Sequence, residues 1–193
     1  MIRVKLYDTT LRDGAQGEGI SYSVMDKVRI AQELDMLGVH YIEGGWPGSN
    51  PKDMEFYLTM SKKQFKNAQL VAFGSTRKPQ TQAGEDKNLV ALLKSKARVV
   101  TIFGKTWELH ITDVLKTTLE ENLNMIKDTV SFLVSKGLTV FYDAEHFFDA
   151  YNANKDYSLE CLLTAQEAGA KAVVLCDTNG GTLTLGIFKV VRE

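Results

Sequence analysis

Charged and polar side chains recur directly after short apolar runs along the 193-residue chain. The residues at these positions whose types could do chemistry are Arg12, Asp13, Gln16, Glu43, His110, Glu145 and Thr178. Carboxylates bind hard cations or exchange protons, and the permanently charged arginine fork suits an oxyanion or a carboxylate. If the fold brings the ends of the runs together, these residue types indicate a site for a small anionic substrate.

The elements that must position these residues alternate between apolar runs and amphipathic helical stretches. The runs occupy residues 4–6, 41–42, 70–73, 99–103, 138–142 and 172–176. Successive runs begin 29 to 39 residues apart, which is long enough for a strand, a crossover helix and two loops. The sequence therefore predicts about six strand-helix units.

Helix start and stop signals support this reading. Ser23 and Asp26 form a capping box, and Gly38 ends a helix whose apolar stripe is expected to hold Val28, Ile30, Ala31, Leu34 and Leu37. Two more helices are predicted over residues 113–136 and 157–168, each ended by a glycine.

Repeated strand-helix units predict a parallel sheet, either a doubly wound open sheet or a TIM barrel. A GxGxxG turn after the first strand would favour the doubly wound sheet, and the sequence lacks it. A barrel needs eight units and typically about 250 residues. We therefore expect residues 1–193 to form one α/β domain holding about the first six units of a TIM barrel, with two further strands beyond residue 193.

The loops carry a resemblance to a known family. The relevant segments are LYDTTLRDGAQGEG (6–19), IEGGWPGSNPKD (42–53), FGKTWELHITDVL (103–115), YDAEHFFDAY (142–151) and VLCDTNGGTL (174–183). Together they resemble the metal-dependent Claisen-condensing family of isopropylmalate, homocitrate and citramalate synthases, whose barrel is shared by lyases that cleave hydroxymethylglutaryl-CoA. The tryptophan in the second segment and the EHFFDAY of the fourth are most similar to the citramalate synthase branch.

The resemblance, which spans essentially the whole chain, implies a pyruvate carboxyltransferase-like catalytic domain. The implied reaction is condensation of acetyl-CoA with pyruvate to (R)-citramalate and CoA, an acyl transfer in isoleucine biosynthesis. One alternative is an isopropylmalate synthase-like enzyme acting on 2-oxoisovalerate. An alternative of another class is a non-catalytic fragment, because the family's His-x-His metal ligands have no counterpart among the three histidines here.

The resemblance also implies catalytic and metal-binding roles. Arg12 would steady negative charge on an enolate or alkoxide, and Asp13 would bind a divalent cation, whether Mg, Mn or Zn. Glu43 would complete the family's Asp-Arg-Glu trio, either through a structural link to Arg12 or by touching substrate. Glu145 would lie near the acetyl group, for positioning or proton transfer.

Three further residues are expected on the substrate side. Gln16 would contact the substrate or brace the first loop, and Thr178 would lie near the oxo acid or shape a turn. His110, like His146, would be either substrate-side or a loop-packing residue. His40 precedes its strand, so we expect it at the opposite end of the barrel.

The overall charge balance limits the partners. Lysine and arginine total 23 against 24 acidic residues, so a nucleic acid is not expected. No window approaches 18 uninterrupted apolar residues, which predicts no membrane span and a cytoplasmic protein. The expected partners are small molecules, a 2-oxo acid and acetyl-CoA, and the resemblance implies a homodimer at full length.

Overall fold

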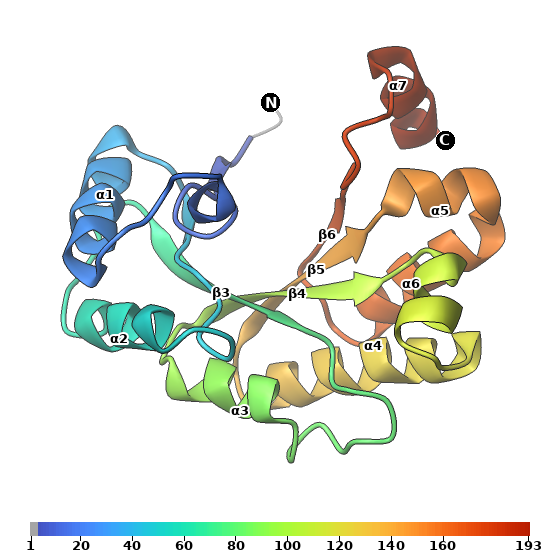
Figure 1. Ribbon diagram of the computed structural model, residues 1–193, viewed down its shortest axis with the longest axis horizontal. Helices are drawn as coiled ribbons and strands as arrows, with labels where there is room; N and C mark the ends of the chain where they lie inside the picture. The colour runs from blue at the N-terminus through green and yellow to red at the C-terminus, as the bar shows by residue number, and fades with distance from the viewer. Residues whose placement is uncertain (1–3) are drawn as a thin grey trace.

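Six parallel strands lie side by side in chain order in the computed structural model, which describes residues 4–193 (Figure 1). They are β1 (Tyr7–Asp8), β2 (Tyr41–Glu43), β3 (Gln69–Ser75), β4 (Val99–Lys105), β5 (Thr139–Glu145) and β6 (Ala172–Leu175). A doubly wound sheet reverses its strand order at a switch point, and this sheet does not. The sheet curls in one direction, so the fold is a partial TIM barrel of about six units.

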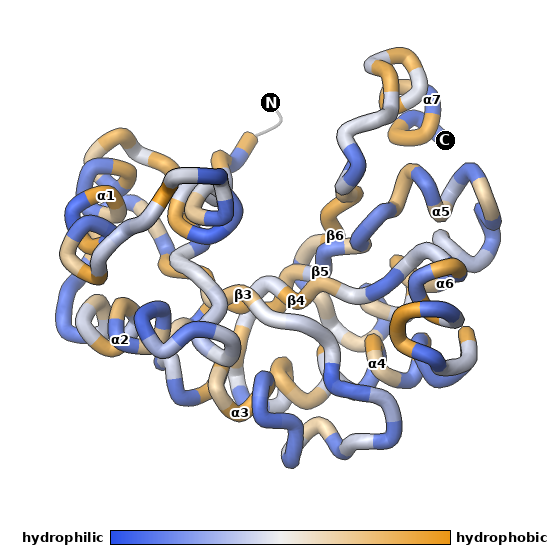
Figure 2. The backbone as a smooth tube through the Cα atoms, viewed as in Figure 1, coloured by the Kyte–Doolittle hydropathy of each residue, from blue (hydrophilic) through white to orange (hydrophobic). Residues whose placement is uncertain are grey.

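Helices cover the outer face of the sheet. They are α1 (Val24–Leu37), α2 (Pro51–Met60), α3 (Lys87–Lys94), α4 (Leu119–Ser135) and α6 (Lys155–Glu167). Two further helices, α5 (Phe147–Ala153) and α7 (Thr184–Arg192), follow β5 and β6 (Figure 1). The main core, with Phe56, Val100 and Leu133 fully buried, packs between these layers. Figure 2 shows apolar residues along the strands, whereas the loop between β3 and α3 is hydrophilic.

Alternation along the strands decides which side chains face the barrel interior. A small inner cluster of Val71, Val99 and Phe141 packs against Tyr7 and Tyr41. Positions 143 and 145 lie two and four residues after Phe141, so the side chains of both acidic residues also point inward. The interior of the barrel is therefore apolar at the inner cluster and carries carboxylates at the carboxyl end of β5.

The predicted first helix is confirmed, with its capping box at Ser23 and a left-handed Gly38 at its end. The expectation for Leu37 is wrong, because this side chain is 78% exposed. Leu37 comes nine residues after the buried Val28, about two and a half turns, which places it on the opposite side of the helix.

The predicted helix over residues 113–136 begins later than expected, at Leu119. Asp113 belongs instead to a separate π-helical turn, His110–Val114. Lys116 then adopts a left-handed φ of 54°, which interrupts the helix. Thr118 caps the new start by accepting a hydrogen bond from the backbone N–H of Glu121. The third predicted helix is confirmed as α6, two residues earlier at its start.

The first strand is also displaced from the predicted run at residues 4–6. Val4 and Leu6 are exposed at the edge of the sheet, and the strand is confined to Tyr7–Asp8. The carbonyl of Leu6 still accepts hydrogen bonds from the backbone N–H groups of His40 and Tyr41, so this segment follows β2 without burying its apolar side chains. Between residues 4 and 193, no helix combines the length and the apolar character that crossing a bilayer requires.

Candidate active site

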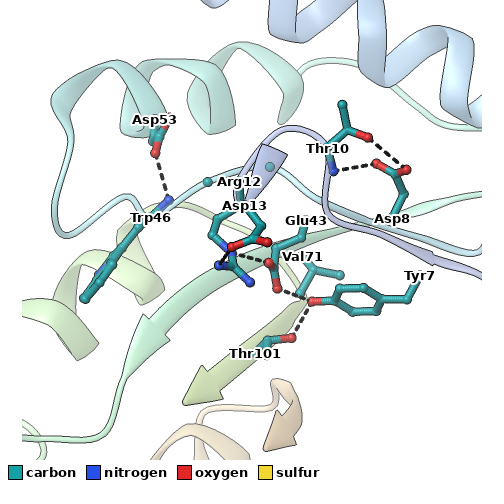
Figure 3. Close-up of polar contacts among 12 residues, drawn as sticks. Tyr7, Asp8, Thr10, Arg12, Asp13, Glu43, Trp46, Asp53, Val71 and Thr101 are labelled. Carbon is teal, nitrogen blue, oxygen red and sulfur yellow. Dashed lines mark hydrogen bonds and ion pairs between the residues drawn. The ribbon is translucent and has the colours of Figure 1, made fainter. Parts of the chain in front are cut away.

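A fixed guanidinium is the centre of the site (Figure 3). Arg12 Nε donates to Glu43 Oε1 at 2.5 Å, and Arg12 Nη1 donates to Asp13 Oδ1 at 2.8 Å. The guanidinium carbon also lies 4.0 Å from the centre of the Phe73 ring, a cation-π contact. Contacts on three sides orient the arginine before any substrate arrives, and Nη2 makes no hydrogen bond within residues 4–193.

Glu43 anchors this arrangement from the barrel interior. Its side chain is fully buried, and its second carboxylate oxygen accepts a hydrogen bond from the Tyr7 hydroxyl, which also contacts Thr101 Oγ1 at 2.6 Å. The structural link to Arg12, which the sequence left open beside direct substrate contact, is therefore present.

Burial and charge act in opposite directions on this pair. Burial raises the pKa of Glu43, and the neighbouring Arg12 charge partly offsets that rise. For Arg12, burial lowers the pKa, but the charge and hydrogen bond of Glu43 together with the charges of Asp13 and Asp143 outweigh it, so the net pKa is raised. Arg12 accordingly remains a cation at any physiological pH.

A cleft of about 460 Å³ lies at the carboxyl ends of the strands, next to this guanidinium. It brings together five residues singled out from the sequence: Arg12, Asp13, Gln16, Glu145 and Thr178. The remaining lining residues are three aromatic side chains, Trp46, Phe73 and Phe103, and three residues at or just after the ends of β5 and β6, Asp143, Cys176 and Asp177. The carboxyl ends of the strands are where parallel barrels carry their active sites.

Glu145 and Thr178 have defined partners at the cleft. Lys105 and Glu145 are opposite each other in the β4–β5 register, and their side chains form an ion pair. Thr178 Oγ1 accepts a hydrogen bond of 2.9 Å from the backbone N–H of His146. Because that contact uses a lone pair of the oxygen, the hydroxyl hydrogen of Thr178 is left for another acceptor.

His110 is the predicted substrate-binding residue that does not line the cleft. Its ring lies 5.1 Å from that of Trp107 and 4.6 Å from that of His146, measured between ring centres. Burial lowers its pKa, which favours the neutral ring. The observed surroundings are those of a packing residue, and a substrate contact by His110 stays a prediction. His40, expected at the opposite end, accepts a hydrogen bond from the Leu6 N–H there.

Sequence reasoning missed Asp143, which faces the interior between Phe141 and Glu145. Its carboxylate makes no hydrogen bond within residues 4–193, although it lines the cleft. Burial and the Glu43 charge raise its pKa and the Arg12 charge lowers it, with a net pKa of about 7. The alternation of Asp143 with Glu145 in YDAE was the available signal, because residues two apart in a strand share a face.

Asp143 should make the folded state less stable as pH rises. The unfolded chain ionises at the ordinary value of 3.8 and the folded state at about 7, so between these pH values the folded state binds more protons. The free energy of unfolding should therefore fall across this window, and Asp143→Asn should remove that fall. Urea unfolding at several pH values, with a chelator present, measures both profiles; parallel profiles for the two proteins would contradict the assignment.

The divalent cation implied by the resemblance meets an incomplete set of ligands in this chain. Asp13 is exposed over 64% of its side chain and is already paired with Arg12. Across residues 4–193, no three His, Cys, Asp or Glu side chains are grouped closely enough to hold a metal ion. The described residues therefore do not fit a complete metal site, and Asp13 stays a predicted ligand.

A buried ion pair fixes the loop between β2 and α2. Lys27 Nζ pairs with Asp53 Oδ1 and donates to the Gly44 carbonyl at 3.0 Å. Figure 3 shows the other contact of this carboxylate, in which Asp53 Oδ2 accepts from the Trp46 N–H at 2.8 Å. Gly45 has a φ of 140°, and a Cβ there would lie 2.4 Å from the Asp53 carboxylate. Glycine at this position is thus required both by backbone conformation and by space.

The fold and the cleft at the carboxyl ends of its parallel strands define the class: a TIM-barrel protein whose cleft is lined by Arg12 and by four acidic side chains. The sequence profile of the HMGL-like family matches residues 3–193, and the chain belongs to that family.

Curated relatives in this family are longer proteins. The chain is 56% identical over 191 residues to the (R)-citramalate synthase of Aquifex aeolicus, covering 99% of this chain and 36% of that protein. It is 57% identical over 188 residues to the (R)-citramalate synthase of Synechocystis sp., covering 97% and 34%. A 2-isopropylmalate synthase of Sulfurisphaera tokodaii is 35% identical, with 92% and 43% covered. The chain thus spans about a third of the length of the citramalate synthases it matches.

Solved structures support the same fold. The hydroxymethylglutaryl-CoA lyase of Pseudomonas aeruginosa superimposes with a TM-score of 0.79 at 20% identity, covering 98% of this chain and 63% of that one. The HMG-CoA lyase of Brucella melitensis gives a TM-score of 0.71 at 14% identity, covering 98% and 67%. At these identities the likeness establishes the barrel architecture alone.

Proposed function

We propose that the chain is part of an acyltransferase that condenses acetyl-CoA with pyruvate and hydrolyses the resulting CoA thioester with water, giving (R)-citramalate and CoA. The observation that carries the proposal is the pre-oriented Arg12 guanidinium, which faces a cleft with an aromatic side and a carboxylate side. The five (R)-citramalate synthases among its relatives, at 52–57% identity, support this reaction. The isopropylmalate synthase alternative has support from relatives at 35% identity.

Each cleft residue has a role in this proposal. Arg12 stabilises the negative charge that develops on oxygen when the enolate of acetyl-CoA attacks the keto carbon. Its orientation by Glu43 lets it act without rearranging during the reaction. Glu145, paired with Lys105, positions the acetyl group or exchanges its proton, and Gln16 and Thr178 hold the oxo acid through hydrogen bonds.

Other features remain predictions. Asp13 is proposed as one carboxylate ligand of a divalent cation, which would polarise the keto group of the oxo acid. Residues 1–193 are proposed to lie in one catalytic domain, and the homodimer and the cytoplasmic location are expectations from the resemblance.

The proposal predicts release of CoA from acetyl-CoA when pyruvate is supplied. The assay follows the free thiol and identifies the product by mass, using the full-length enzyme and, separately, residues 1–193. We expect full-length enzyme to require an oxo acid and to prefer pyruvate to 2-oxoisovalerate. A preference for 2-oxoisovalerate would favour the isopropylmalate synthase alternative. If residues 1–193 alone show no activity, the alternative that this length of chain is a non-catalytic fragment is favoured.

A further inference from the structure

Three aromatic rings form one side of the cleft, and we name Trp46, Phe73 and Phe103 the aromatic wall. Phe73 and Phe103 are stacked, with ring centres 5.3 Å apart and planes at 16°. The Trp46 ring stands edge-on to both, at 5.8 Å and 84° to Phe73 and at 5.5 Å and 82° to Phe103. All three line the same cleft as Arg12, so the wall borders the space that a substrate would occupy.

Trp46 is held in this position from two directions. Its Nε1 donates to Asn88 Oδ1 at 2.5 Å, and its backbone N–H donates to Asp53. Asn88 is itself fixed, because its Nδ2 donates to the Ser75 carbonyl at 2.9 Å. A Cβ on Gly48 would lie 2.8 Å from Asn88 Oδ1, so the loop packs closely against this amide. Moving the indole therefore means breaking hydrogen bonds in a crowded region.

The wall lies beside the group that would bind the substrate's charge. The Arg12 guanidinium lies 4.0 Å from the centre of the Phe73 ring. A 2-oxo acid is small, so when Arg12 holds its carboxylate or keto oxygen, the carbon substituent is within a few bonds of the same rings. A wall that cannot move back leaves room for a short substituent and excludes a branched one.

We propose that the aromatic wall selects the 2-oxo acid by the size of its carbon substituent, with Trp46 as the specificity-determining residue and Asn88 as its positioning residue. This inference rests on the proposed function and names the residues that set its preference for a 2-oxo acid with a methyl group over one with an isopropyl group. Arg12 serves the keto oxygen common to all 2-oxo acids, and the wall distinguishes among their carbon substituents.

The test compares kcat/KM for pyruvate, 2-oxobutanoate and 2-oxoisovalerate in the full-length enzyme. Trp46→Leu should raise the ratio of 2-oxoisovalerate to pyruvate by on the order of ten-fold or more, because a difference of one or two carbons in an apolar pocket is worth about that much. Trp46→Phe, a milder change that keeps an aromatic ring, should shift the ratio for 2-oxobutanoate. Phe132→Leu on the outer helix α4 is the matched control and should leave all ratios unchanged.

Variants of Asn88 provide the second part of the test. Asn88→Ala should shift the ratios in the same direction as Trp46→Leu, because the indole loses its hydrogen-bond acceptor. Asn88→Asp keeps an oxygen acceptor for Trp46 Nε1 but loses the Nδ2 donor to the Ser75 carbonyl, so it should restore the wild-type preference only in part. A role in folding alone would lower kcat/KM for all three substrates equally and would overturn the assignment.

The outcomes separate the two proposals. Wild-type enzyme that condenses pyruvate, with ratios unmoved in both Trp46 variants, overturns the role of the wall and leaves the proposed function in place. Wild-type enzyme with equal kcat/KM for 2-oxoisovalerate and pyruvate would also overturn the role of the wall and leave the proposed function in place. Wild-type enzyme that releases no CoA with any 2-oxo acid overturns the proposed function and, with it, this inference.

Discussion

Replacing Arg12 by lysine should lower kcat for condensation by about a hundred-fold to a thousand-fold, the usual effect of losing one preorganised donor to a developing oxyanion. The arginine fork binds Glu43 through Nε and Asp13 through Nη1, and still has donors left for a substrate. A lysine ammonium is a single point charge, and the buried Glu43 carboxylate would hold it away from the cleft. The loss should be larger in kcat than in KM for pyruvate, because the interaction is strongest in the transition state.

Arg77→Lys is the matched control for this substitution. Arg77 is also buried and pairs with Glu121 and Asp128, but it lies in the loop after β3, away from the cleft. We expect this variant to lose stability and to keep its kcat. Equal falls in kcat for both variants, or an effect of Arg12→Lys confined to KM, would show that Arg12 does not serve the transition state.

Replacing Lys27 by methionine should lower the free energy of unfolding by about 3–5 kcal/mol, the range for breaking a buried ion pair from one side. Lys27 and Asp53 are both buried, and methionine fills a similar volume without the charge. The substitution leaves the Asp53 carboxylate uncompensated while it still accepts from the Trp46 N–H. Urea unfolding of residues 1–193 measures the loss.

The double variant Lys27→Met with Asp53→Asn tests the cause. Asparagine keeps an oxygen for the Trp46 N–H and removes the stranded charge, so this variant should regain much of the stability lost in Lys27→Met. A double variant as unstable as the single one would mean that the lost contacts of Lys27, including its bond to Gly44, account for the effect.

The order of the elements could be predicted from the sequence because each crossover length and helix cap is a local signal. The capping box at Ser23 and the glycine stop at Gly38 are formed by neighbouring residues, and both predictions are confirmed. The start of α4 could not be predicted in this way. It depends on the left-handed backbone at Lys116, a residue type that gives no warning of that conformation.

The site residues also fall into those that local sequence signals predict and those whose role depends on residues distant in the chain. Residues placed by a loop directly after a strand, such as Arg12 and Thr178, could be predicted to meet at one end of the barrel. Asp143 was missed because its importance comes from burial near Glu43 and Arg12, which are a hundred residues or more earlier in the chain. For His110 the sequence left a substrate contact and a packing role open, because strand order says nothing about the π-helical turn that packs its ring against Trp107.

The close approach of Gly45 to Asp53 has a consequence for how this protein can diverge over time. A side chain at position 45 would collide with the Asp53 carboxylate, and loss of that carboxylate would strand the Lys27 charge and release Trp46. Because of these contacts, a single replacement at position 27, 45 or 53 should lower the stability of the fold. A replacement at one of these positions should therefore persist only with a compensating replacement at another. Substitutions at these three positions should therefore occur together during evolution. The aromatic wall that they support should be among the slowest parts of the chain to change.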